Sequence, residues 1–223
     1  MLSPVLRLPG LVTGERLTVE EFLRRWEHLP ELKNAELIDG VVFVPSPVSL
    51  DHGSLDSMMI WWLTEYSYAT PGCQSGNNCT WLMLGDAPQP DAHLRILPEH
   101  GGQSRNQEQY GAGAPELVVE ISLTSTEIDF GSKLALYERA GVREYITVAM
   151  FGQRIVWRVL RDAHYEDQVI LEDGVLKSAV FPGLWLSVPA FWREDLAKMA
   201  EVLRAGLSTG EHRRFVAQLA AAK

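Results

Sequence analysis

The sequence predicts an α/β (α+β) protein in which a sheet is layered against helices. The strand-like run "PELVVEIS" at residues 115–122 leads into the helix-forming "DFGSKLALYERAG" at 129–141, a pairing typical of layered α/β sheets. Beyond it, short segments separated by turn signals predict an antiparallel meander. Residues 193–223 carry helix formers, so the chain is expected to end in a helical extension.

The composition is that of an ordinary globular protein. Of 223 residues, 46% are hydrophobic and 22% are charged, which is far from the composition of disordered chains. This length suits one domain, and we expect residues 1–190 to form it and residues 191–223 to be a C-terminal helical extension of it. The formal net charge of −9 argues against a protein that coats nucleic acids through bulk charge. It is compatible with a nuclease, because a site that gathers cations must itself be acidic.

The sequence carries no sign of export or membrane insertion. Its opening residues are interrupted by Pro4, Pro9 and Gly10, and no apolar run approaches the roughly 20 residues needed to cross a bilayer. Cys73 and Cys79 are too few for a zinc site and are expected to be reduced thiols. We therefore expect a soluble, cytoplasmic protein without a membrane partner.

The first third of the chain predicts two helices around a hairpin. Thr18 and Glu21 have the spacing of a capping box at a helix start. Asp39-Gly40 predicts a tight hairpin turn, because both turn positions need positive φ. The expected elements are a helix at 17–30, strands at 35–38 and 41–44, and a helix from 49 to 70.

Strands dominate the remainder of the chain. Between two of them the polar, glycine-rich segment 103–114 is expected to be a loop. The expected strands lie at 79–85, 90–97, 115–122, 144–150, 154–160, 164–171 and 175–180, the last four forming the meander. Two final helices are expected on either side of residues 206–210.

An acidic residue within the clearest strand is the strongest functional signal. Period-2 geometry places Glu120 and Ser122 on one face of that strand. If the preceding strand pairs with it, Asp91 would lie beside Glu120. Two carboxylates that close repel each other unless one is protonated or a cation lies between them. Hard oxygen ligands favour Mg²⁺ or Mn²⁺.

Each candidate also has an ordinary structural explanation. Asp91 can begin a strand or cap a turn, and a solvent-facing edge strand would tolerate Glu120. Lys133 can be a solvated helix residue, but within reach of the acids its ammonium could hold an attacking water or offset charge on a phosphate. Glu36 and His52 carry no chemical signal by themselves.

The order of the motifs is more informative than any one of them. The chain contains "ELIDG" from Glu36, "SP" followed by His52, "PD", "PELVVEIS", the pair Asp129 and Lys133, and "Y...AGVREY" ending at Tyr145. This series resembles the Uma family of putative restriction endonucleases, a branch of the PD-(D/E)XK nuclease superfamily.

The resemblance implies a restriction-endonuclease-like fold with a central mixed sheet flanked by helices. It also implies hydrolysis of DNA phosphodiester bonds with Mg²⁺ or Mn²⁺, in which Asp91 and Glu120 bind the metal and Lys133 completes the catalytic set. The superfamily usually places the lysine two residues after the acid, where this chain has Ser122. A lysine on the following helix resembles this branch. The supporting residues would be Glu36, His52, Ser122 and Asp129.

The quaternary structure and the function class stay open at this stage. Cutting both strands of a duplex would suit a homodimer. A nuclease-like scaffold without turnover, binding DNA or proteins, agrees with the net acidity. A small-molecule-binding β-rich protein agrees with the meander but has no convergent His ligands. Nicking of plasmid DNA that needs a metal and is lost in Glu120→Gln would separate the enzyme from the scaffold.

Overall fold

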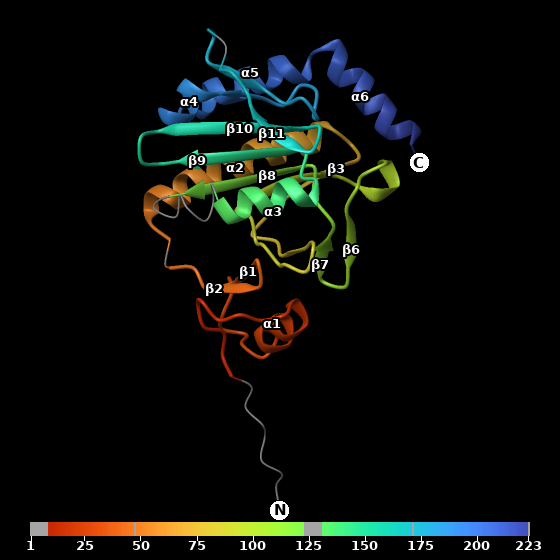
Figure 1. Ribbon diagram of the computed structural model, residues 1–223. Coiled ribbons are helices and arrows are strands. Elements are labelled where there is room, and N and C mark those ends of the chain that lie inside the picture. Colours follow the sequence, from red (N-terminus) through yellow and green to blue (C-terminus); the bar gives the residue numbers. More distant parts are fainter. Residues whose placement is uncertain (1–8, 47, 123–130, 171, 223) are drawn as a thin grey trace, which may run out of the picture.

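Six strands form the central sheet of the computed structural model, which describes residues 9–46, 48–122, 131–170 and 172–222. They are β3 Cys73–Asn77, β5 Ala92–Ile96, β8 Leu117–Ser122, β9 Glu144–Ala149, β10 Arg154–Arg161 and β11 His164–Asp167. Their order in space is β11-β10-β9-β8-β5-β3 (Figure 1). The β8–β9 pair is parallel and the other neighbours are antiparallel, so the sheet is mixed, as the family resemblance implies.

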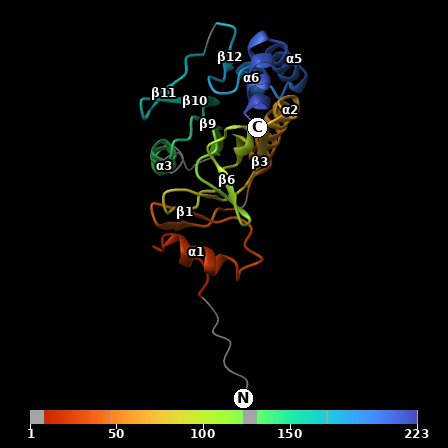
Figure 2. The same ribbon diagram turned by 90° about the vertical axis from the view of Figure 1, so that its right-hand side faces the viewer.

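Helices cover both faces of the sheet (Figures 1 and 2). The long helix α2, Leu50–Ala69, packs on the face formed by Leu117, Val119 and Ile121 of β8. The same hydrophobic cluster includes residues of α4 Val188–Trp192, α5 Leu196–Leu207 and α6 Gly210–Ala221. On the opposite face, α3 Lys133–Ala140 packs against Val118 of β8. The central strand β8 is therefore buried on both faces.

Smaller units surround this core. α1 Val19–Trp26, β1 Glu36–Ile38 and β2 Val41–Phe43 form an N-terminal unit with its own hydrophobic cluster, at the lower end of Figure 1. β4 Trp81–Leu82, β6 Arg105–Gln107 and β7 Tyr110–Ala112 make a three-stranded sheet, while β12 Val175–Lys177 and β13 Trp185–Ser187 make a two-stranded one. A 3-10 turn occupies Pro98–His100. Among the described residues, no helix is both long and apolar enough to cross a bilayer.

Local sequence signals account for several of these boundaries. The Thr18 side chain accepts a hydrogen bond from the Glu21 amide at the start of α1, as its cap spacing predicts. Ser49 caps α2 in the same way. Asp39 and Gly40 have φ values of 51° and 69°, as a two-residue hairpin turn requires. The predictions of these two helices and the hairpin are confirmed.

Four expectations about the strands were wrong. The segment 103–114, expected to be a loop, contains the hairpin β6–β7. Strand β3 was not predicted, because its sequence "CQSGN" lacks β-formers and the strand depends on pairing with β5. Only two residues of 79–85 form a strand, and they pair outside the central sheet. The last strand expected in the meander, β12, leaves it and pairs with β13.

Candidate active site

The register of β5 and β8 brings two acids together. Ala92 pairs with Val119 and His93 with Val118 in antiparallel register, so Asp91, just before β5, falls opposite Glu120. Asp91 Oδ2 accepts a hydrogen bond of 2.7 Å from the backbone N–H of Ile121. Asp91 is therefore fixed at the end of β8 where Glu120 projects, the juxtaposition that the period-2 argument predicts.

Glu120 is held by two groups of α3. Its side chain is 4% exposed, so the carboxylate is almost fully buried. Lys133 Nζ donates to Oε2 at 3.0 Å, and the Tyr137 hydroxyl donates to Oε1 at 2.7 Å. Because β8 is a buried central strand and Lys133 is itself only 4% exposed, both ordinary explanations, an edge strand and a solvated helix residue, are wrong.

The N-terminal unit contributes a third carboxylate. Glu36, on β1, contacts Lys133 Nζ through Oε1 at 2.9 Å. The same oxygen accepts a 2.7 Å hydrogen bond from the backbone N–H of Gln89, two residues before Asp91. The Lys133 ammonium thus lies between Glu36 and Glu120, and the hairpin is linked to the segment that carries Asp91.

The first turns of α2 approach the acids from another side. His52 Nε2 lies 3.8 Å from Asp91 Oδ1, a separation too long for a hydrogen bond. Asp56, one turn later on α2, has its pKa raised to about 6, mainly by burial and next by the negative charge of Asp91. Asp56 Oδ1 is buried without a hydrogen-bond partner within the described ranges.

The other predicted residues are less informative. Ser122 lies two residues beyond Glu120 on the same strand face, and its hydroxyl is buried with no partner among the described residues. Asp129 lies outside the described residues. Sequence reasoning gave no role to Tyr137, although its i, i+4 spacing from Lys133 places both side chains on one face of the helix.

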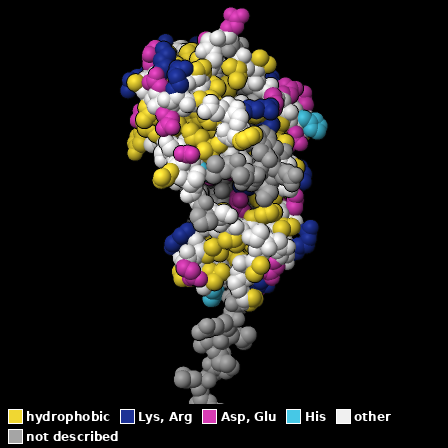
Figure 3. All heavy atoms as spheres, turned by 90° about the vertical axis from the view of Figure 1, so that its left-hand side faces the viewer, with side chains coloured by type: hydrophobic (Ala, Val, Ile, Leu, Met, Phe, Trp, Pro, Cys, Tyr) yellow, Lys and Arg dark blue, Asp and Glu magenta, His cyan; other side chains and the backbone are white. Residues whose placement is uncertain are grey.

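The site is strongly acidic. In the view of Figure 3, acidic side chains are visible in a hollow between the main body and the smaller unit below it. The Lys133 ammonium contacts the carboxylates of Glu36 and Glu120, and Asp91 lies opposite Glu120 on the neighbouring strand. Such a site attracts cations and repels phosphates unless a cation is bound. In the described ranges, no group of three or more His, Cys, Asp or Glu side chains is already arranged around a possible metal position.

A mixed sheet flanked by helices, with this acidic pair and lysine on one face, defines a restriction-endonuclease-like protein. The model of the Uma2 family, described as "Putative restriction endonuclease", matches residues 19–189. The chain belongs to this family, and the resemblance in its motifs is confirmed.

A solved structure supports the fold. The crystal structure of a putative nuclease belonging to DUF820 from Anabaena variabilis ATCC 29413 is similar with a TM-score of 0.61 and 16% sequence identity. The likeness covers 79% of this chain and 98% of that one. At this identity the comparison concerns the fold alone. No curated protein matches the chain.

Proposed function

We propose that the protein is a metal-dependent DNA endonuclease that hydrolyses phosphodiester bonds with Mg²⁺ or Mn²⁺. Membership of the Uma2 family supports a nuclease, and hence a hydrolase with a nucleic-acid substrate. The finer proposal depends chiefly on one observation. Asp91 and Glu120 lie opposite each other on neighbouring strands, and the Lys133 ammonium contacts Glu120.

The donor set fits a hard divalent cation. Asp91 and Glu120 supply carboxylate oxygens, and the backbone carbonyl of Ile121 is the third oxygen ligand in this proposal. Proteins usually hold Mg²⁺ by one or two carboxylates, with water and phosphate oxygens completing the octahedron, so a larger preformed cluster is not required. When bound, the cation would polarise the scissile phosphate and lower the pKa of a bound water.

The protein's own side chains would position the reacting groups. Lys133 is suited to orient the attacking water and to offset negative charge that develops on the phosphate, because an ammonium is a compact point charge. Tyr137 would hold one oxygen of Glu120 and so fix the direction of the other. The supporting residues in this proposal are Glu36, His52, Ser122 and Asp129.

The test is nicking of supercoiled plasmid by purified protein in Mg²⁺, in Mn²⁺ and in EDTA. Wild type is expected to nick only with a divalent metal, and Glu120→Gln to be slower by at least about 100-fold, since it removes a metal ligand. Glu201→Gln is the matched control, because Glu201 is 69% exposed on α5, and it should behave as wild type. Equal nicking by wild type and Glu120→Gln would refute the assigned site.

The alternative is a nuclease-like scaffold that binds DNA or proteins without turnover. The net charge of −9 favours it, because the field of the whole protein repels DNA. The absence of metal-dependent nicking under every condition would support this alternative.

A two-fold dimer and a cytoplasmic location complete the proposal. One subunit could then address each strand of a duplex. Light scattering on the purified protein should give twice the chain mass of 25.0 kDa, and plasmid cleavage should yield linear product early. A monomeric mass with nicked circles alone would contradict the dimer.

A further inference from the structure

A cavity separate from the candidate active site lies between the β3 edge of the central sheet and the three-stranded sheet. Its volume is about 260 Å³, and it is lined by residues of β3, β4, β5 and the β6–β7 hairpin. None of Asp91, Glu120 and Lys133 lines it. Its floor is formed by the buried side chains of Trp81, His93 and Arg95. Each of these side chains carries at least one polar nitrogen atom.

Arg95 is a buried cation in this floor. The residue is 6% exposed, and no carboxylate within the described residues forms an ion pair with its guanidinium. Its nearest partners are neutral: Nε and Nη2 donate to Gln74 Oε1, and the guanidinium lies 5.7 Å from the centre of the Trp81 ring. A guanidinium has five N–H donors, so most of them stay available.

Burial lowers the pKa of Arg95, and the negative charge of Glu116 opposes this shift only in part. The Glu116 carboxylate is itself hydrogen-bonded elsewhere. Both Glu116 oxygens accept backbone N–H groups, those of Ile96 and Gln103. Burying a cation without a paired anion is costly, and a bound anion would remove that cost.

Two further polar groups in the floor lack hydrogen-bond partners within the part of the chain that the structure describes. His93 is 4% exposed and its Nδ1 is buried without a hydrogen bond among the described residues, as is the Trp81 indole nitrogen. Burial lowers the pKa of His93 to about 3, so the ring is neutral and can donate one N–H. Unsatisfied polar groups of this kind are uncommon in native interiors.

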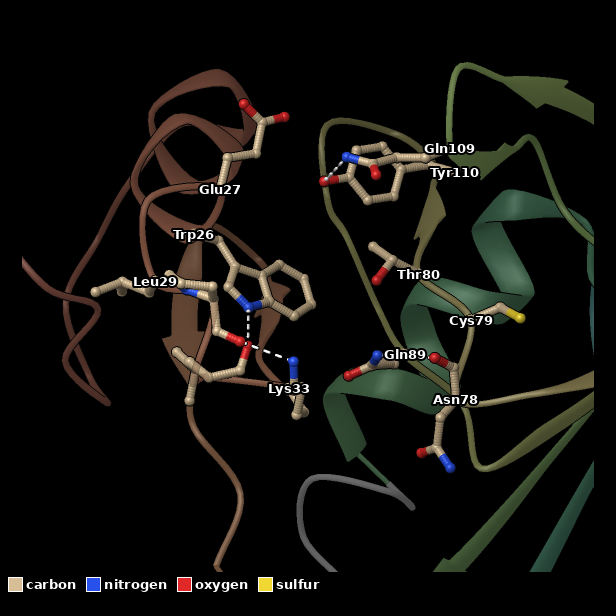
Figure 4. A pocket seen from close by; sticks show the side chains of 12 residues that line it. Trp26, Glu27, Leu29, Lys33, Asn78, Cys79, Thr80, Gln89, Gln109 and Tyr110 are labelled. Atoms are coloured by element: carbon tan, nitrogen blue, oxygen red, sulfur yellow. Dashed lines mark hydrogen bonds between the residues drawn. The ribbon is translucent and has the colours of Figure 1, made fainter.

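A larger cavity of about 490 Å³ adjoins this one, and both are lined by Cys79, Gln109 and Tyr110. Figure 4 shows the larger cavity between Trp26 and Lys33 of the N-terminal unit and the polar side chains of the sheet side. Aromatic rings and amides suit a nucleobase, which stacks on rings and is read by hydrogen bonds. A phosphate at Arg95 would have room for its nucleoside.

The position of Arg95 relates this cavity to the candidate active site. Arg95 and Asp91 lie on the same strand face, four residues apart, or about 13 Å at the rise of a strand. We propose that the cavity at Arg95 binds a phosphate group of a nucleic-acid strand whose scissile phosphodiester lies at Asp91 and Glu120. That the phosphate belongs to a nucleic acid rests on the proposed function; that the cavity binds phosphate does not.

Binding measurements in EDTA test the proposal without turnover. Fluorescence anisotropy of labelled 12-nucleotide single strands, with and without a 5′-phosphate, would compare wild type with Arg95→Gln. We expect about 10-fold weaker binding and a salt slope smaller by about 0.7 for the variant, because one phosphate contact is lost. Arg161→Gln is the matched control: it removes the same charge from a residue 61% exposed on β10 and should change neither quantity.

A second variant guards against misfolding. Asn106→Asp places a carboxylate at the exposed part of the lining, where it would compete with phosphate for Arg95, and we expect the same loss. Inorganic phosphate should raise the melting temperature of wild type and of Arg161→Gln, but not of Arg95→Gln or Asn106→Asp.

The outcomes separate this site from the proposed activity. Unchanged binding and unchanged salt slope in both cavity variants would overturn the phosphate site, even if plasmid nicking is intact. Binding that depends on Arg95 without any nicking would uphold the phosphate site and refute the endonuclease. If inorganic phosphate raises the melting temperature but the cavity variants bind oligonucleotides as wild type does, the cavity binds phosphate and the proposal that this phosphate belongs to a nucleic acid is refuted. A gain from the 5′-phosphate alone would identify a strand end as the ligand.

Discussion

Replacement of Lys133 by Met should reveal how much the buried ammonium stabilises the fold. Lys133 Nζ lies 2.9 Å from Glu36 and 3.0 Å from Glu120, and Glu120 is 3% exposed. Removing one partner of a buried ion pair costs about 3–5 kcal/mol, because a buried charge is left without compensation. We expect Lys133→Met to lose this amount of unfolding free energy, measured by urea denaturation in EDTA.

A surface ion pair provides the control for this loss. Lys198 contacts Glu201 at the shorter distance of 2.7 Å, but their side chains are 46% and 69% exposed. Exposed pairs of this kind contribute about 0.5 kcal/mol, so Lys198→Met should unfold almost as wild type does. Burial, and not a shorter contact, therefore accounts for the larger loss expected of Lys133→Met.

Added metal should partly restore the Lys133→Met variant. A cation that binds only the folded protein stabilises it by mass action, by about 2.7 kcal/mol when present at 100 times its Kd. Mg²⁺ should therefore recover much of the lost stability. A loss below about 1 kcal/mol in EDTA, similar to that of Lys198→Met, would refute the view that Lys133 balances the acids.

Three further predictions concern other parts of the molecule. Tyr137→Phe should slow plasmid nicking by about 10–100-fold and raise the Mg²⁺ concentration that gives the half-maximal rate. The charged carboxylate of Glu120 would lose the hydrogen bond that the Tyr137 hydroxyl donates. Burial raises the pKa of Glu144 from its ordinary value of 4.5 to about 7 in the folded protein. The unfolded chain therefore releases this proton at lower pH than the folded protein does, and raising the pH from about 4.5 to 7 favours unfolding. The free energy of unfolding of Glu144→Gln, relative to that of wild type, should therefore increase by up to about 3 kcal/mol between pH 4.5 and 8 in urea denaturation. Gly102→Ala should lower the free energy of unfolding by at least about 2 kcal/mol in urea denaturation, because the added Cβ would lie 1.8 Å from the Ile96 carbonyl oxygen.

Each of these has a contrasting measurement. Tyr66→Phe removes another buried hydroxyl, bonded to the Pro182 carbonyl, and should leave the Mg²⁺ dependence unchanged; an equal shift in both variants would contradict a role in positioning. A Glu144→Gln difference that does not change with pH would contradict the burial argument. Gly53→Ala, with nothing within 4 Å, should stabilise α2 by about 0.5–1 kcal/mol.

The central acids were predictable because they depend on strand geometry. The side chains of a strand alternate, and β8, which carries Glu120, is the next strand of the central sheet after β5, which Asp91 directly precedes. Sequential strands are often neighbours. The contacts of Glu36 with Lys133 and Gln89 were not predictable, since they join segments far apart in sequence through particular side-chain conformations.

The missed strands have a common physical cause. β3 and the β6–β7 hairpin are rich in polar residues and Gly, which have low strand propensity, and they form because a neighbouring strand supplies hydrogen bonds. The turn between β6 and β7 uses Glu108 at φ 54°, a conformation that Glu does not signal in a sequence. The long, regularly patterned α2 needed no such context.

The contact between α3 and Glu120 has a consequence for how this site tolerates change. Lys133 reaches the carboxylate from the first turn of a helix, while Ser122 points to the same side of β8 from within the strand. A lysine at position 122 would therefore approach Glu120 from the same side of β8. The double replacement of Ser122 by Lys and Lys133 by Ser would move the ammonium from the helix to the strand while keeping the same functional groups. An amine on this side of β8 would meet the same carboxylate from the helix or from the strand.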